Sequence, residues 1–125
     1  MPVEVIWDDD EKTIVRQIYS GVVTLEDYHS AIDDVATLVS SVDYIVHSIM
    51  DRTAITRTEG SFMKAMKYSD GKMPKNMGLR VIIKASRMTE VIANMGRYLA
   101  PDLINNIEFV DTLEEARNTI AKHNA

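Results

Sequence analysis

Two short stretches with the composition of β-strands open the chain. Residues 3–7 and 13–19 are rich in β-branched and aromatic side chains, and the acidic segment 8–11 lies between them. Two such stretches joined by a short polar turn predict an antiparallel hairpin. Gly21 follows, where the second strand either ends or contains a bulge. Alternate residues of the second stretch share one face: Val15, Gln17 and Tyr19.

A helix is predicted to begin after Thr24. Thr24 is a good N-cap, and Asp27 three residues later approximates a capping box. The carboxylates in the first turn also suit the positive end of the helix dipole. Ser40 and Ser41 end the pattern. The apolar residues recur at helical spacing and form one face: Leu25, Tyr28, Ile32, Val35 and Val39.

Strand-like and helix-like segments alternate after this helix. Apolar runs predict strands at residues 44–50, 79–85 and 107–110. Helical spacing predicts helices at 59–68 and 86–100, and a last helix that Thr112 and Glu115 begin with a capping box. Polar residues predict a loop at 51–58, and glycine and proline predict another at 69–78.

The resulting element order is β-β-α-β-α-β-α-β-α. Alternation of this kind is typical of α/β proteins with a largely parallel sheet. We therefore expect a single domain over residues 1–125 with a mixed, mostly parallel sheet of about five strands and four helices.

The composition is that of a globular protein. Hydrophobic residues make up 46% of the 125 positions and charged residues 26%, which argues against disorder. The chain has 0 cysteines, which excludes disulfides, thiolate metal sites and a cysteine nucleophile. The acidic start does not resemble a signal peptide, and the apolar runs are too short to span a membrane. We expect a cytoplasmic protein.

The net charge of -5 is unevenly distributed along the chain. Residues 1–51 carry 11 acidic and 2 basic residues, whereas residues 52–97 carry 3 acidic and 10 basic ones. A basic middle segment can attract phosphates, anionic lipid or an acidic partner surface. Alternatively, it neutralises the acidic first half of its own chain, or that of a second copy.

The residues that could carry chemistry form no convincing catalytic set. His47, Ser48 and Asp51 are the residue types of a hydrolase triad, but His47 and Ser48 are neighbours on a strand and point to opposite faces. His47 is expected to be a buried neutral histidine, and the terminal His123 is expected to be disordered. Neither zinc-ligand spacing nor a glycine-rich phosphate motif occurs. We expect a protein that is not an enzyme and that has no cofactor and no metal.

The 8 methionines fall mainly in the second half of the chain. Methionine fills gaps in cores, and it also makes adaptable binding surfaces. In the binding interpretation, an apolar groove between the second and third helices has a basic rim and takes a partner helix or an acyl chain. Aromatic residues are too few there for base stacking, so nucleic acid is not expected as a partner. The groove and rim residues are Met63, Met66, Met88, Met95, Arg52, Arg57, Lys64, Lys67, Lys72 and Lys75.

Two motifs carry a resemblance to a known family. Residues 21–28 read Gly-Val-Val-Thr-Leu-Glu-Asp-Tyr, and residues 110–116 read Val-Asp-Thr-Leu-Glu-Glu-Ala. The first is similar to the G-x-(I/V/L)-T-x-E-D-Y opening of the SpoIIAA-like group of STAS domains. The second is similar to the group's closing pattern, an aspartate or similar residue before x-E-A in the last helix. STAS is the fold of anti-sigma factor antagonists, and this group is also placed with Sec14-like lipid-binding domains.

The resemblance implies a non-catalytic regulatory or protein-interaction module, expected to self-associate as a homodimer. The Sec14-like grouping implies the alternative, a module that binds lipid or a small apolar anion. Ser61 falls where antagonists carry their phosphorylated serine, but Glu59-Gly60-Ser61-Phe62 departs from the D-S-S-G pattern. We therefore expect no phosphorylation switch at Ser61. The basic middle segment is expected to give at most weak, salt-sensitive contact with anionic membranes.

Overall fold

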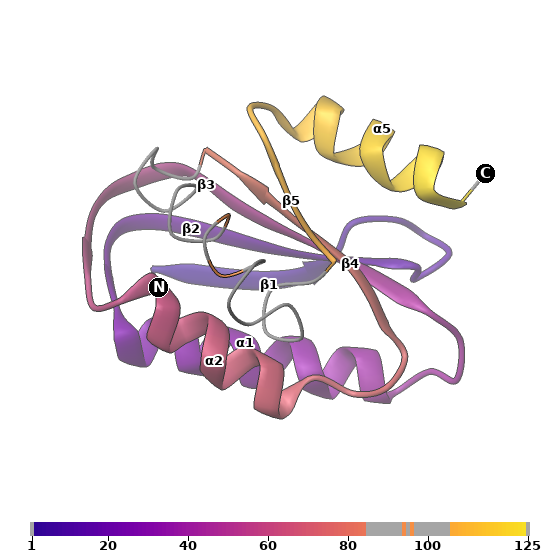
Figure 1. The fold of residues 1–125 in the computed structure, drawn as a ribbon, viewed down its shortest axis with the longest axis horizontal. Helices are drawn as coiled ribbons and strands as arrows, with labels where there is room; N and C mark the ends of the chain where they lie inside the picture. Colours follow the sequence, from indigo (N-terminus) through magenta and orange to yellow (C-terminus); the bar gives the residue numbers. More distant parts are fainter. Residues whose placement is uncertain (1, 85–93, 95, 97–105, 125) are drawn as a thin grey trace.

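The computed structural model describes residues 2–84, 94, 96 and 106–124 as a five-stranded sheet with helices on both faces (Figure 1). The strands are β1 (Val3–Trp7), β2 (Ile14–Thr24), β3 (Val46–Glu59), β4 (Met77–Ile83) and β5 (Ile107–Val110). The helices are α1 (Leu25–Ser40), α2 (Phe62–Lys72) and α5 (Leu113–Asn124).

The strands lie in the sheet in the order in which they occur along the chain. β1 and β2 are antiparallel and form the predicted hairpin, and every later neighbour pair is parallel. The expected mixed, mostly parallel sheet is confirmed. Crossover helices make this pattern possible because parallel strands need a connection long enough to return to the starting edge.

The helices form two layers around the sheet. α1 and α2 lie side by side on one face, and α5 covers the other (Figure 1). Tyr19 and Met50 pack under the helix pair, whereas Ile49 and Val81 pack against α5. Burying both faces explains why the central strands are almost continuously apolar. The predicted inward face of α1 is confirmed, since Tyr28, Ile32, Val35 and Val39 are all buried.

The described residues contain fewer helices than the prediction gave for the whole chain. Three helices lie in the described part of the chain, so the expectation of four is not supported. The predicted helix at 86–100 falls outside the described residues, apart from positions 94 and 96.

One predicted loop is wrong, and another is shorter than predicted. Residues 51–58 continue β3, because β2 runs on past Gly21 and pairs with this segment as far as Thr24 and Glu59. The outer part of this strand is exposed, and its polar composition therefore resembled a loop. α2 likewise continues through Gly71 to Lys72, into residues predicted as loop. The alternative of a bulge at Gly21 is confirmed, because the register shifts between Gly21 and Val22.

The predicted helix caps have the expected geometry at α1. The Thr24 hydroxyl accepts from the Asp27 amide at 3.2 Å, and the Asp27 carboxylate accepts from the Thr24 amide at 2.8 Å. At α5, Thr112 accepts from the Glu115 amide at 3.1 Å. The Glu115 carboxylate reaches the amide of Asp111 rather than that of Thr112. Side-chain acceptors at these ends satisfy amides that the helix itself leaves unpaired.

Two glycines give a matched test of backbone conformation. A Cβ added at Gly71 or at Gly21 would touch nothing within 4 Å, but Gly21 has φ +67 whereas Gly71 is helical. Gly71→Ala should raise the free energy of unfolding by about 0.5–1 kcal/mol, because alanine loses less chain entropy in a helix. Gly21→Ala should lower it by about 1 kcal/mol, because L-residues avoid that backbone region. Urea denaturation measures both, and equal effects would contradict the explanation.

Candidate functional site

A small cavity lies between the helix pair and the sheet. It offers about 20 Å³ to the centres of water-sized molecules, and its lining is mostly apolar. This volume suffices for a water molecule, because a single water needs roughly 10–15 Å³ by this measure. Met66, Met73 and Met77 form much of the apolar wall, and Gln17, Ser48, Ser69 and Arg80 bring polar groups to it.

Arg80 is the only charged residue among those that line this cavity in the described structure. It projects from β4, and its guanidinium donates to the Ser69 hydroxyl of α2 at 3.3 Å. In the described part of the chain, no carboxylate forms an ion pair with Arg80. Burial lowers the pKa of Arg80, and the charge of nearby Asp70 partly opposes that shift.

A second, open cleft adjoins the cavity. Its volume is about 250 Å³, and its lining includes Asp70, Pro74 and Asn106. Three residues belong to both spaces and therefore separate them: Met73, Met77 and Arg80. Arg80 thus contacts an apolar interior on one side and a polar opening on the other.

The basic residues predicted for the groove rim do not act alike. Arg57 pairs with Glu59 at 2.8 Å on the exposed part of β3. Arg52 turns inward and donates to the Tyr28 hydroxyl, and its guanidinium also lies 5.6 Å from the centre of the Tyr28 ring. Lys72 lies 5.5 Å from the centre of the Tyr68 ring. Lys64, Lys67 and Lys75 are exposed.

Of the four methionines predicted to line the groove, only the side chain of Met66 is described. It is 3% exposed and belongs to the core under α1 and α2. The side chain of Met63 lies outside what the structure describes, as do Met88 and Met95 as whole residues. The groove between the second and third predicted helices therefore stays a prediction.

A buried tyrosine pair lies beside Arg52. The rings of Tyr19 and Tyr28 are 5.2 Å apart, and the Tyr19 hydroxyl donates to the Gln17 side-chain oxygen at 2.6 Å. Burial raises the pKa of Tyr19 far above its usual value, so this hydroxyl keeps its proton. The Nε of Arg52 is buried and has no hydrogen-bond partner among the described residues.

His47 is a structural residue, as its position in the sequence predicted. It is 4% exposed, its Nδ1 accepts from the Leu79 amide at 2.8 Å, and its Nε2 lies 2.9 Å from the Asn124 side-chain oxygen. An accepting Nδ1 means that Nε2 carries the proton and donates to Asn124. A Cβ at Gly78 would come within 2.6 Å of the ring. The prediction of a disordered His123 is wrong, because it lies in α5 with its ring 5.5 Å from His47.

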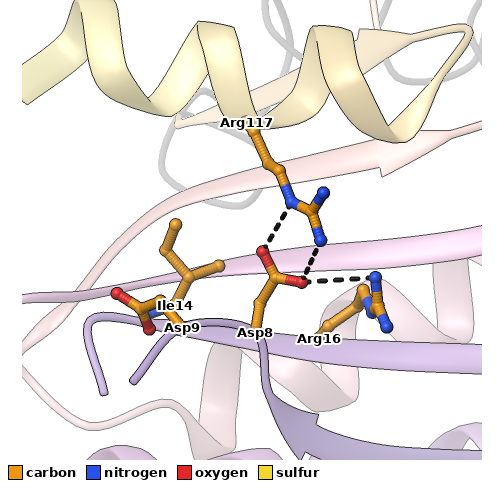
Figure 2. A network of polar contacts seen from close by, with 5 residues as sticks. All are labelled: Asp8, Asp9, Ile14, Arg16 and Arg117. Atoms are coloured by element: carbon orange, nitrogen blue, oxygen red, sulfur yellow. Dashed lines mark hydrogen bonds and ion pairs between the residues drawn. The ribbon is translucent and has the colours of Figure 1, made fainter. Parts of the chain in front are cut away.

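An ion-pair network joins the first hairpin to the last helix. Figure 2 shows the Asp8 carboxylate between Arg117 of α5 and Arg16 of β2. Arg117 donates to both carboxylate oxygens at 2.9 and 2.8 Å, and Arg16 lies 3.2 Å away. The Asp8 side chain is only 3% exposed. The hydrogen bond from Arg117 is the main reason that the pKa of Asp8 is lowered, although burial opposes it.

Two general features limit the chemistry of the described part. No group of three histidine or acidic side chains in residues 2–84, 94, 96 and 106–124 converges as metal ligands would. Within the same residues, no helix has the length and the apolar character needed to cross a lipid bilayer.

Similar solved structures share this arrangement of strands and helices. An uncharacterised DUF3478-family protein from Shewanella loihica, described as having a SpoIIAA-like fold, is 13% identical, with a TM-score of 0.61 over 93% of this chain and 90% of that one. The Bacillus cell fate determinant SpoIIAA in its phosphorylated form is 10% identical, with a TM-score of 0.57 over 94% of this chain and 98% of its own. This chain has the SpoIIAA-like fold. No protein-family model matches it, and no curated protein sequence does.

Within the SpoIIAA-like fold, Ser61 begins α2. Its hydroxyl accepts from the Lys64 amide at 3.3 Å and so serves as the N-cap. This is the role of an ordinary capping serine. That Ser61 is not phosphorylated stays a prediction.

The polar residues of the cavity were missed as a set by the sequence analysis. Gln17 was placed on the same face as Val15 and Tyr19, and Arg80 interrupts the apolar run from Leu79 to Ile83. A polar residue on the buried face of a strand is the signal that could have found both. Nothing in the sequence indicated that Ser69 would meet Arg80, because that contact depends on how far α2 extends.

Proposed function

We propose that this protein is a non-catalytic regulatory module that acts by binding a protein partner, and that one such partner is a second copy of itself. The shared fold with SpoIIAA, over nearly the whole length of both chains, supports the regulatory part of the proposal. SpoIIAA is described as a cell fate determinant of Bacillus, and its structure is that of the phosphorylated form.

The surface of the helix pair supports the binding part of the proposal. α1 contains four acidic residues and no lysine or arginine, and its neighbour α2 contains three lysines and one aspartate. Glu26, Asp33 and Asp34 are exposed on α1, and Lys64 and Lys67 are exposed on α2. None of the ion pairs in the described residues joins α1 to α2. Asp33 accepts a hydrogen bond from the Tyr68 hydroxyl of α2 at 2.8 Å. The other four charges remain available for a partner.

Two copies can satisfy these charges reciprocally. In a two-fold dimer, the acidic α1 of each copy can face the basic α2 of the other, because a two-fold contact always forms in duplicate. Exposed ion pairs add little individually but steer association and set its specificity. We expect a salt-sensitive homodimer at high micromolar protein concentration.

A charge-swap experiment tests this arrangement. Lys64→Glu with Lys67→Glu should give a monomer, and so should Glu26→Lys with Asp34→Lys, because each change makes both contacts repulsive. Mixing the two variants should restore a dimer, which sedimentation velocity detects. Arg57→Gln is the control, because Arg57 already pairs with Glu59. A wild-type protein that stays monomeric would contradict the proposed self-association. Mixed variants that stay monomeric would contradict the proposed contact between α1 and α2.

A further inference from the structure

We propose that Arg80 binds a small monocarboxylate with a short aliphatic tail. The carboxylate accepts from the guanidinium in the open cleft, and the tail enters the methionine-lined cavity. This inference is independent of the proposed protein partner, because Arg80 lies inside the fold and not on the helix surface described above.

The state of the Arg80 guanidinium is the first argument. A guanidinium has five N–H donors, and a buried one usually meets a carboxylate. Here it donates to one neutral hydroxyl, that of Ser69, and has no ion pair among the described residues. Arg80 lines both the cavity and the cleft. A half-buried guanidinium that contacts no carboxylate among the described residues costs stability even with the charge of Asp70 nearby, and an anionic ligand would offset that cost.

The two adjoining spaces are the second argument. The polar cleft and the apolar cavity meet at Met73, Met77 and Arg80. A ligand there has a polar end on one side of the guanidinium and an apolar end on the other. Methionine side chains are flexible and can move to widen a cavity that is small when empty. Sites of this kind are mostly apolar with a few placed polar groups that fix orientation.

The charge balance of the cleft selects the ligand class. Asp70 lies in the cleft lining together with Arg80. Arg80 is the one cation among the described lining residues, so a second negative charge on the ligand would find no cation of its own and would cost more to desolvate beside Asp70. A monocarboxylate therefore fits better than inorganic phosphate. A carboxylate also matches the planar fork of a guanidinium, which can donate to both of its oxygens.

Titration with a series of carboxylates, followed by NMR on isotopically labelled protein at neutral pH, tests the proposal. Acetate, propionate and butyrate should shift the Arg80 Nε–H and Ser69 amide signals. Affinity should rise by about four-fold for each added methylene that enters the cavity. Butanol, which has the same tail without the charge, and inorganic phosphate should both bind more weakly than butyrate. Equal affinities for acetate and butyrate would overturn the tail assignment, and tighter binding of phosphate would overturn the ligand class.

Variants locate the site. Arg80→Gln should weaken butyrate binding at least ten-fold, and Arg57→Gln should leave it unchanged. Arg80→Gln should also unfold at the same temperature or higher, because it removes an unneutralised half-buried charge, whereas a purely structural arginine would show a lower unfolding temperature. Ser69→Ala is the milder second variant, with an expected loss of about five-fold. The proposal is overturned if Arg80→Gln leaves butyrate binding unchanged, or if butyrate gives no shift of the Arg80 signal. The cavity would then hold only an ordered water.

Discussion

Replacing Asp8 with alanine is expected to lower the free energy of unfolding by about 2–3 kcal/mol. The change removes two hydrogen bonds from Arg117 and the ion pair with Arg16, and it leaves both guanidiniums without their shared anion. Breaking a fully buried ion pair costs about 3–5 kcal/mol, and the smaller figure here reflects the 49% exposure of the Arg117 side chain. Urea denaturation followed by circular dichroism measures the loss.

Glu59→Ala provides the matched control, because it removes an equally short ion pair whose partners are 66% and 52% exposed. Its expected cost is about 0.5 kcal/mol or less. The Asp8 contribution should also depend on pH. The pKa of Asp8 is lowered from 3.8 in the folded protein, so its stabilisation is complete above that pH and is lost as the pH falls through the folded value. Equal costs for the two variants would contradict the role of burial.

His47→Phe is expected to cost about 2–4 kcal/mol although it keeps a ring in the core. Phenylalanine cannot accept from the Leu79 amide, which then remains buried without a partner, and it also loses the contact with Asn124. An unsatisfied buried donor costs about 1–3 kcal/mol and a lost hydrogen bond about 1 kcal/mol. Asn124→Ala, which leaves the Leu79 hydrogen bond intact, should cost about 1 kcal/mol. Thermal and urea unfolding would separate the two variants, and equal losses would contradict the importance of the Leu79 amide.

The same histidine predicts a pH dependence near neutrality. Burial lowers the pKa of His47 below 6.5, so between the two values the unfolded chain binds a proton that the folded protein does not. Stability should therefore fall as the pH drops below about 6.5 and level off below the folded pKa, with a slope of at most about 1.4 kcal/mol per pH unit. The His47→Phe variant should lack this slope, so the stability difference between the two proteins should change with pH in this range. A slope that persists in the variant would assign it to another group.

The arrangement of the core could be predicted from the sequence because it depends on local patterns. Helical spacing after Thr24 places the same side chains inward in the prediction and in the structure, and the face shared by Val15, Gln17 and Tyr19 is the buried face of β2. The outer half of β3 could not be predicted in this way. It is stabilised by pairing with β2 beyond Gly21, and an exposed pair of strands needs no apolar alternation.

The candidate site depended on information that no local pattern contains. The glycine and proline pattern predicts a loop at Ser69, whereas in the structure Ser69 is a buried residue of α2 beside Arg80. The inward turn of Arg52 similarly depends on Tyr28, which lies 24 positions away. The order of residues in the chain predicts that the basic residues of the middle segment form one rim around the methionine groove. Whether a cation faces solvent or the core is decided by the tertiary partner it meets, which the order of residues does not reveal.

The sequential order of the strands has a consequence for synthesis on the ribosome. Each strand pairs with the one made just before it, from β1 through β5, so the sheet can grow at one edge as the chain emerges. α5 is made after all five strands, and through Arg117 and Asn124 it binds residues made near the beginning and middle of the fold. Emergence of this twelve-residue helix from the ribosome should therefore be the step that converts a nascent, still exchangeable sheet into a protected native fold.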